Sequence, residues 1–326
     1  MIKKATQIIT KETNPYRNLA LEEYLLLHVE EEECILYLWQ NRHTVVIGRN
    51  QNCWKECRVS ELEEDGGFLA RRLSGGGAVY HDLGNLNFTF LVRKENYDVD
   101  RQLQVILEAV RKLGIRAEKT GRNDLTVEGR KFSGNAFYQT GNCCYHHGTL
   151  LLSVDTAQMS RFLNVSKEKL QSKGVSSVKS RVANLSEFCP GLTVEQMAEK
   201  LFEAFGEIYG CQAERIAESR LDAEEIAKAA ARFESFEWKY GRKIPFQFSF
   251  GKRFVWGDLQ FQFVVDEGVV RAAEIYSDAM DEQWIAALKK SLPGCRYTRE
   301  ALSEAVNRAG ERAFADDVKA LIRENV

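Results

Sequence analysis

The chain has little of several features that define whole classes of protein. It has four prolines in 326 residues and a formal net charge of -2. No apolar run approaches the ~20 residues that span a bilayer, so we expect no membrane partner. Nucleic-acid-binding proteins usually carry a strongly basic domain, so the charge balance argues against DNA or RNA as a partner. The first 18 residues lack an apolar signal core, which predicts a cytoplasmic location.

Cysteine is present but follows no disulfide or metal pattern. The eight cysteines are scattered over positions 34, 53, 57, 143, 144, 189, 211 and 295. In a long chain without an export signal, scattered cysteines are best interpreted as free thiols. Cys53 and Cys57 are four residues apart, but no second pair at zinc spacing follows them.

The pattern of apolar residues predicts alternating helices and strands over most of the chain. Hydrophobic residues make up 44% and charged residues 28%, as in ordinary globular proteins, and the length allows two domains. Helical spacing predicts helices over residues 18–29, 101–113, 193–209 and 221–236. Strands are predicted over 34–39, 44–48 and 86–92, and three more within 124–154, separated by turns at Glu128-Gly129 and Gly141-Asn142.

The composition changes near residue 240. Phe246, Phe248 and Phe250 alternate in period two, as do Phe261, Phe263 and Val265. Turn signals at Gly251, Gly257-Asp258 and Glu267-Gly268 predict an antiparallel meander, followed by helices to the end. We expect a small α+β unit whose aromatic stripe forms a core rather than a ligand site.

The stretch "RRLSGGGAVYHDLGN", residues 71–85, contains three consecutive glycines. Such a run can form a tight turn that needs positive φ, or it can bring backbone N–H groups close to an anion. The turn is the more common of the two for an isolated run of glycines. Arg71, Arg72 and Ser74 shift the balance towards the second interpretation, because guanidinium and hydroxyl groups suit phosphates and carboxylates, and both interpretations stay open at this point. His81-Asp82 could be a base with its orienting carboxylate, or loop residues that satisfy backbone groups, and the second is slightly favoured.

Three further stretches combine glycine, cations and polar side chains: "GRNDL" (121–125), "GRKFSGNAF" (129–137) and "SKGVSSVKSRVANL" (172–185). A single anionic ligand of nucleotide size could recruit all of them. Lys131 is either a solvated strand lysine or an ammonium group placed where negative charge develops. The pair His146-His147 is more typical of hydrogen-bonded structural residues than of metal ligands.

These stretches, together with "YHHGTLLL" (145–152), resemble the successive motifs of the lipoate–protein ligase A family, in the same order and spacing. "NLALEEYLL" (18–26), "TVVIGRNQNCWKE" (44–56) and "FVWGDLQFQFVVDEG" (254–268) resemble it as well, so the similarity covers nearly the whole chain. The resemblance implies a mixed α/β (α+β) fold. A catalytic domain like that of biotin ligases is expected over residues 1–242, and a small accessory domain over 243–326.

The resemblance also implies a reaction and its participants. Lipoate and ATP would give lipoyl-adenylate and pyrophosphate, and the lipoyl group would pass to a lysine of a carrier, either a 2-oxoacid dehydrogenase E2 subunit or the glycine cleavage H protein. Lys131 would be the catalytic residue, and Asp124 would hold Mg²⁺. Contacts to ATP and the adenylate are expected from Arg71, Arg72, Gly75, Gly76, Gly77, Ala78, Val79, Asn123, Asp124, Lys131, Ser180 and Arg181. Contacts to lipoate are expected from Arg71, Ser74, Gly76, His81, Lys131, Ser133, Gly134, His147 and Gly148. The loop over residues 176–184 would close over the adenylate.

Two other functions remain open at the level of sequence. An ATP-independent octanoyl- or lipoyl-amidotransferase of the same superfamily would use a cysteine nucleophile. Cys143 or Cys144, predicted in a loop before "YHHG", could serve, activated by His146 or His147. A protein that binds lipoate or a carrier domain without chemistry is the second alternative, although it would need no cation at a reacting centre.

Overall fold

The computed structural model describes residues 2–120, 124–164, 182–240 and 247–326. They form two compact units. The larger contains Met1–Val46, Cys57–Ala70 and Val79–Lys239, and the smaller contains Ile47–Glu56, Arg71–Ala78 and Tyr240–Val326. Two segments from the first third of the chain therefore fold with the C-terminal part. The predicted boundary between 242 and 243 lies outside the described residues and stays a prediction.

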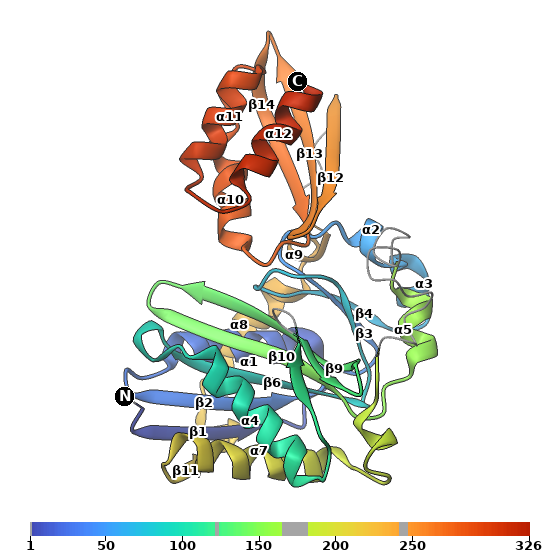
Figure 1. Ribbon diagram of the computed structural model, residues 1–326, viewed down its shortest axis with the longest axis vertical. Coiled ribbons are helices and arrows are strands. Elements are labelled where there is room, and N and C mark those ends of the chain that lie inside the picture. Colours follow the sequence, from blue (N-terminus) through green and yellow to red (C-terminus); the bar gives the residue numbers. More distant parts are fainter. Residues whose placement is uncertain (1, 121–123, 165–181, 241–246) are drawn as a thin grey trace. The chain divides into compact units, whose positions relative to one another are not determined.

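The larger unit is built on a mixed sheet, as the resemblance implies (Figure 1). Its strand order is β11-β1-β2-β6-β10-β9-β8-β7. The pairings of β1 with β11 and with β2 are parallel, and the rest are antiparallel. The strands are β1 (Lys4–Ile9), β2 (Glu33–Trp39), β6 (Asn85–Arg93), β7 (Glu118–Thr120), β8 (Asp124–Val127), β9 (Arg130–Thr140), β10 (Cys143–Leu151) and β11 (Ala213–Arg215).

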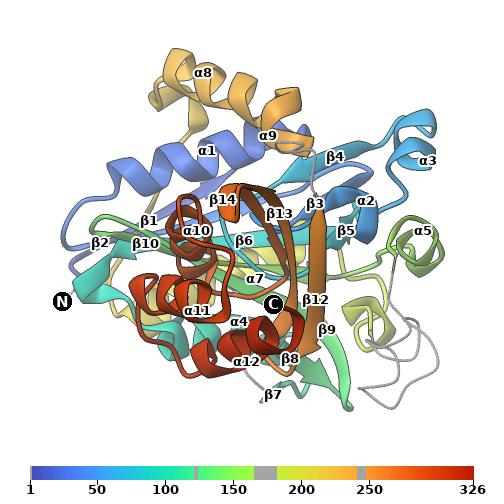
Figure 2. The ribbon, with the colours of Figure 1, turned by 90° about the horizontal axis from the view of Figure 1, so that it is seen from above.

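Helices cover both faces of this sheet. On one face, α4 (Val99–Lys112) and α7 (Val194–Tyr209) bury their apolar stripes against β2, β6 and β10. On the other lies α1 (Pro15–His28), with α8 (Ala223–Glu234) packed on its outer side (Figure 2). The cap residue of α1 is Asn14, whose side chain accepts hydrogen bonds from two backbone N–H groups that begin the helix. The four predicted helices are thus confirmed, with ends shifted by a few residues.

The two predicted hairpins, which join β8 to β9 and β9 to β10, are confirmed. Glu128 and Gly129 have φ of 50° and 73° in the turn between β8 and β9, as a two-residue hairpin turn of the primed type requires. Gly141, with φ of 53°, makes the turn between β9 and β10. The placement of Cys143 and Cys144 in a loop is wrong. Both belong to β10, because the strand begins directly after that turn.

The elements that remain before residue 241 are short, and one of them, α2 (Cys53–Glu56), belongs to the smaller unit. A three-stranded sheet has the order β4-β3-β5, with β3 (Thr44–Ile47), β4 (Phe68–Arg71) and β5 (Val79–His81). The short helices are α2 (Cys53–Glu56), α3 (Val59–Glu64), α5 (Thr156–Phe162), α9 (Phe236–Tyr240) and the 3-10 turns η1 (Lys94–Asn96), η2 (Leu185–Glu187) and η3 (Glu218–Arg220). Among the described residues, no helix has both the length and the apolar character needed to cross a bilayer. All eight cysteines are free thiols, as predicted.

The C-terminal part of the smaller unit is an α+β unit with an antiparallel meander, as predicted. Strands β12 (Phe248–Phe254), β13 (Gly257–Asp266) and β14 (Val269–Ser277) form an antiparallel sheet, backed by α10 (Glu282–Ser291), α11 (Arg299–Arg308) and α12 (Ala315–Asn325) (Figure 1). Phe261 and Phe263 are fully buried against these helices, and Phe250 and Val265 pack against the same core, so this part of the stripe is core as predicted. The prediction is wrong for Phe248, which is 46% exposed. The predicted turn at Gly251 is wrong. This glycine lies within β12, where an added Cβ would meet the Leu259 carbonyl of β13 at 2.5 Å.

Candidate active site

Lys131 lies near the start of β9, next to a bulge in its pairing with β8. Its ammonium Nζ is 2.7 Å from Oδ1 of Asp124, the first residue of β8. Both side chains are partly exposed, 38% for Lys131 and 27% for Asp124. On its other side the backbone of Lys131 bridges to Val182, and its carbonyl accepts the N–H of Ala183 at 2.9 Å. The lysine thus lies between β8, which begins with Asp124, and the end of the stretch 172–185, two of the segments singled out in the sequence.

Gly134 gives this lysine room to lie across its own strand. A Cβ at position 134 would be 2.8 Å from Nζ of Lys131 and 2.9 Å from Cε. The Gly134 N–H donates to Oγ1 of Thr149 on β10 at 3.3 Å. The absence of a side chain at Gly134 therefore allows the Lys131 ammonium group to lie over this position of the strand.

Ser133 and Gly148, predicted to contact lipoate, belong to the opposite face of the same strands. Ser133 is completely buried and is paired with the core residue Leu125. A Cβ at Gly148 would meet the Phe88 ring at 2.6 Å and Oδ1 of Asn135 at 2.7 Å. Gly148 therefore has a packing reason to be glycine, and neither residue is placed beside Nζ of Lys131 by strand alternation.

His147 faces the same side of the sheet as Gly134, and it is held by a glutamate that sequence analysis missed. Its Nδ1 donates to Oε1 of Glu22 in α1 at 2.8 Å, and the same oxygen accepts Oγ1–H of Thr89 at 2.7 Å. Thr89 in turn accepts the indole N–H of Trp39 at 3.1 Å. Glu22 is 1% exposed and lies three residues after Leu19 and four before Leu26, on the apolar stripe of α1. An acid on an apolar stripe is the sequence signal that could have revealed it.

His146 points to the other face and is structural. Its two ring nitrogens contact Oε1 of Gln102 at 3.1 Å and Oδ1 of Asn135 at 2.8 Å. Burial, and to a lesser degree the charge of His147, lower the pKa of His146 to about 3. The ring is therefore neutral at physiological pH and cannot supply a positive charge to a ligand.

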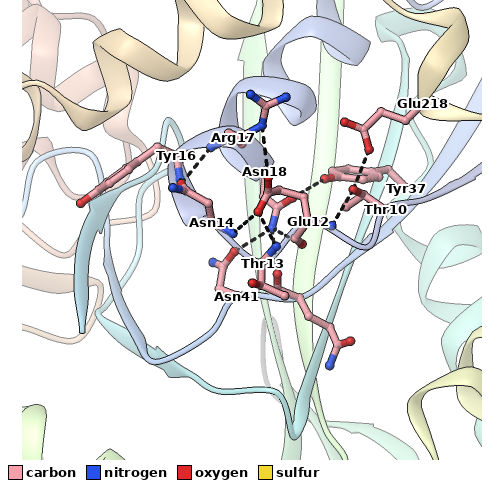
Figure 3. A network of polar contacts seen from close by, with 11 residues as sticks. Thr10, Glu12, Thr13, Asn14, Tyr16, Arg17, Asn18, Tyr37, Asn41 and Glu218 are labelled. Atoms are coloured by element: carbon pink, nitrogen blue, oxygen red, sulfur yellow. Dashed lines mark hydrogen bonds and ion pairs between the residues drawn. The ribbon is translucent and has the colours of Figure 1, made fainter. Parts of the chain in front are cut away.

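His81, at the end of β5, is oriented by a buried amide network that begins in α1. Figure 3 shows Asn18 and Asn41, the two amides of this network. Asn18 donates through Nδ2 to the Glu12 and Gln40 carbonyls and, at 3.0 Å, to Oδ1 of Asn41. Because Oδ1 of Asn41 accepts, its Nδ2 donates to Nδ1 of His81 at 3.2 Å. A neutral His81 therefore carries its proton on Nε2.

Asp82 does not orient His81 as the base-and-carboxylate interpretation would require. Its Oδ1 accepts the Gly84 N–H at 2.8 Å and its Oδ2 accepts the Asp155 N–H at 2.9 Å. The slightly favoured interpretation, in which loop residues satisfy backbone groups, is confirmed for Asp82.

The glycine loop, residues 74–78, is shaped by Arg72. The buried guanidinium donates to Oγ of Ser74 at 3.0 Å and, through Nη2, to the carbonyls of Gly75 at 2.6 Å and Gly77 at 2.8 Å. Arg71 is also buried, and it donates to the carbonyls of residues 48, 49 and 51. Burial lowers the pKa of Arg71 to about 10, which leaves it charged at neutral pH. In these contacts both arginines organise loops, and their role towards phosphate stays a prediction.

The three glycines of the loop have different reasons to be there. Gly76 has φ of 88°, and its N–H donates to the Ala279 carbonyl at 3.2 Å. A Cβ at Gly75 would lie 2.4 Å from the Ala279 carbonyl oxygen and 2.8 Å from that of Met280. Gly77 has open space around its Cβ position. Close backbone packing and positive φ thus account for two of the glycines, and no contact among the described residues requires the third.

Glu282, at the start of α10, is the buried acid of this loop region. Burial raises the pKa of Glu282 to about 7, assisted by the negative charge of Asp281. Hydrogen bonds from its own N–H and from the Gly75 N–H, together with the positive charge of Arg49, act in the opposite direction. Its carboxyl group therefore titrates near neutral pH while it contacts the glycine loop.

We expect the stability of the smaller unit to fall as pH rises from about 4.5 to about 7. The folded Glu282 holds its proton more tightly than the unfolded one, so its contribution is fully present below pH 4.5 and is lost as pH rises through 7. The full change is about 3 kcal/mol. Urea unfolding at pH 5, 6, 7 and 8 measures it, and Glu282→Gln should remove most of this slope. Equal slopes in the two proteins would contradict the assignment.

Cys143 and Cys144 lie at the opposite end of β10 from Gly148 and Thr149. Gly148 is four positions after Cys144, which corresponds to about 13 Å along a strand. Both thiols are buried, Cys143 accepts from Nη1 of Arg93 at 3.0 Å, and burial raises the pKa of Cys144. A buried thiol with a raised pKa is a poor nucleophile.

Three predicted site residues, Asn123, Ser180 and Arg181, lie outside the described residues, as does most of the loop 176–184. Ala78 closes the glycine loop, and Val79 opens β5, where it pairs with Val46 of β3.

Comparison with known proteins gives consistent matches along the chain. The protein-family model of the lipoyl protein ligase A/B catalytic domain matches residues 14–206. The family model of the bacterial lipoate protein ligase C-terminus matches residues 243–320. P. falciparum LipL1, solved in complex with lipoate, is 30% identical over 98% of this chain and 99% of that one, with a TM-score of 0.87.

Two other solved structures are similar over about three quarters of the chain. The bi-partite lipoate protein ligase of Thermoplasma acidophilum, from a study that includes its E2 lipoyl domain, is 25% identical over 74% of this chain and 98% of that one, with a TM-score of 0.64. A lipoate-protein ligase A bound with ATP is 23% identical over 74% of this chain and 99% of that one, with a TM-score of 0.63, a likeness of fold.

Proposed function

The chain belongs to the lipoyl protein ligase A/B family, and from this premise we propose that it is an ATP-dependent lipoate–protein ligase. It would join lipoate to AMP with release of pyrophosphate and then transfer the lipoyl group to a carrier lysine. The observation that carries the proposal is the Lys131 ammonium, held above Gly134 beside the Asp124 carboxylate in the region that matches the catalytic family model.

The chemistry requires a cation at this point. The lipoate carboxylate and the α-phosphate of ATP repel each other, and an ammonium group between them offsets that repulsion as the new C–O–P linkage forms. Lys131 can supply the charge, since its side chain is partly exposed and its ion-pair partner within the described ranges, Asp124, is itself partly exposed. In the transfer step the carrier amine attacks the acyl carbon, the C–O bond to AMP breaks, and the amine loses a proton to water.

Asp124 fits the role of a Mg²⁺ ligand in the proposed reaction. Mg²⁺ is usually held by one or two carboxylates together with substrate phosphates, so a single partly exposed aspartate is a sufficient protein contribution. Among the described residues no group of three or more His, Cys, Asp or Glu side chains could form a complete protein cage, which agrees with a metal that arrives with its nucleotide. Bound Mg²⁺ would neutralise phosphate charge, and Asp124 would then exchange its lysine partner for the metal.

The remaining assignments extend the same proposal. The backbone of residues 75–79 and the side chains of Asn123, Ser180 and Arg181 would bind the nucleotide, while His81 and His147 would border the lipoyl chain. The loop 176–184 would exclude water from the adenylate, a mixed anhydride that hydrolyses readily. Lipoyl domains of E2 subunits and the glycine cleavage H protein are the proposed carriers, with support from the relative that was studied with its E2 lipoyl domain. Free thiols and use of ATP suit a cytoplasmic setting.

A test compares candidate carrier domains by mass spectrometry after incubation with the protein, Mg²⁺, lipoate or octanoate, and ATP or none. We expect the lipoyl mass to appear on the carrier only with ATP, together with pyrophosphate. Transfer without ATP that is lost in Cys143→Ser or Cys144→Ser would support the amidotransferase instead. Absence of pyrophosphate and of carrier modification would support a binding protein without chemistry.

A further inference from the structure

Asn87, in the middle of the sheet, carries a buried amide whose hydrogen-bonding capacity is only partly used. Asn85 donates through Nδ2 to Oδ1 of Asn87 at 3.0 Å. Within the described part of the chain, Nδ2 of Asn87 and Oδ1 of Asn85 have no hydrogen-bond partner, although the two residues are 2% and 0% exposed. If both amides were turned over, the pair would still have one donor and one acceptor unused. Buried polar groups are nearly always satisfied, so this pair is expected to have a partner when the site is in use.

The register of the sheet places Asn87 on the face that carries Lys131. Asn87 of β6 is paired with Trp39 of β2 on one side and with Thr149 of β10 on the other, and paired residues share a face. Thr149 contacts the Gly134 N–H, and Nζ of Lys131 lies 2.8 Å from the Cβ position of Gly134. A continuous row thus runs across the sheet from Trp39 through Asn87 and Thr149 to the lysine.

His81 marks the far end of the same row. Its ring lies edge-on to that of Trp39, with the centroids 6.3 Å apart. A ligand that extends from the Lys131 ammonium towards Trp39 and His81 must therefore pass over Thr149 and Asn87. Asn87 is the position in this row that combines near-complete burial with an unused amide group.

We propose that Asn87 is a further catalytic residue, which donates its amide N–H to the acyl carbonyl oxygen of the adenylate while Lys131 holds the phosphate. This inference rests on the proposed ligase function. Two strand spacings, roughly 10 Å, separate the backbones of Asn87 and Gly134. The asparagine and lysine side chains each span part of this distance, and the proposal places the acyl-phosphate group between them, with a hydrogen bond of about 2.9 Å at either end.

A donor at the carbonyl oxygen acts most strongly during transfer. When the carrier amine adds to the acyl carbon, a C–N bond forms and the carbonyl π pair moves onto oxygen. The oxyanion then collapses, the C–O bond to the phosphate breaks, AMP leaves as an anion and the nitrogen loses its proton to water. Asn87 would stabilise the oxyanion, and loss of one such donor typically costs about 10²–10³ in rate.

The test measures the binding of two stable lipoyl-adenylate analogues by calorimetry, one with the acyl carbonyl and one with a methylene in its place. Wild-type protein should bind the carbonyl analogue about 10-fold more tightly. Asn87→Leu, which keeps the volume but has no donor, should bind the two within about twofold. Transfer of lipoate from supplied lipoyl-adenylate should fall about 10²-fold or more in the same variant.

Asn135→Leu is the matched control, because Asn135 is a buried asparagine on β9 that faces His146 on the opposite side of the sheet. It should lose stability but keep the preference for the carbonyl. If Asn87→Leu folds poorly, Asn87→Ala provides a smaller substitution, also without a donor, for the same measurement. An unchanged preference in both Asn87 variants overturns the inference while leaving the ligase intact. Failure of wild-type protein to bind either analogue or to release pyrophosphate overturns the proposed function instead.

Discussion

Lys131→Ala should reduce lipoate-dependent release of pyrophosphate by roughly 10²–10³-fold or more, while the protein stays folded. The ammonium group is the cation at the proposed reacting centre, and Asp124, its ion-pair partner among the described residues, is itself 27% exposed. Removing the lysine therefore leaves a solvated carboxylate rather than a buried unpaired charge, so the change in the free energy of unfolding should stay below about 1 kcal/mol. Pyrophosphate release and urea unfolding measure the two quantities.

Arg130→Ala is the control for that variant. Arg130 is the neighbouring residue on β9, and its guanidinium pairs with Glu187 at 2.8 Å and lies over the ring of Phe188. The Arg130→Ala substitution removes a positive charge from the same strand but leaves the proposed reacting centre unchanged, so near-normal activity is expected. Full activity of Lys131→Ala would remove the proposed mechanism, whereas equal losses in both variants would indicate a general effect of positive charge.

Local signals in the sequence were sufficient for most of the fold. The stripe Leu103, Ile106 and Val110 packs into the core from α4, and the dipeptide Glu128-Gly129 makes the hairpin between β8 and β9. The errors came where tertiary pairing overrides a residue's local tendency. Gly251 is a turn former by composition but sits in a paired strand, since the approach of β13 leaves no space for a side chain.

The site was harder to predict because its partners are far apart in the sequence. Glu22 and His147, which contact each other, are 125 positions apart in the sequence. Asn87 shares a face of the sheet with Lys131 only because of the register of the three strands β6, β10 and β9. The folding of residues 71–78 with the C-terminal unit likewise has no local signature. A glycine-rich stretch indicates that the backbone packs closely against something, but the structure is needed to identify the neighbouring atoms.

Gly134→Ala should inactivate the enzyme nearly as strongly as removal of the lysine, with a fall of about 10²-fold in pyrophosphate release. The new Cβ would lie 2.8 Å from Nζ and 2.9 Å from Cε of Lys131. These are the outer atoms of a flexible side chain, so the lysine moves and the backbone does not. The free energy of unfolding should change by less than about 1 kcal/mol. Gly148→Ala should instead mainly lower the free energy of unfolding. Its Cβ would meet the Phe88 ring at 2.6 Å and the Gly134 carbonyl at 2.8 Å, which are packed core and backbone atoms.

The double variant Lys131→Ala with Gly134→Ala decides whether the glycine acts through the lysine. If the only effect of the new methyl group is to displace Nζ, it has nothing left to displace once the lysine is alanine, and the double variant should be no less active than Lys131→Ala alone. Losses that multiply would mean that position 134 contributes separately, for instance because a ligand lies directly against its backbone. Lipoate-dependent pyrophosphate release from the four proteins of this cycle, measured at one saturating concentration of ATP, distinguishes the two cases.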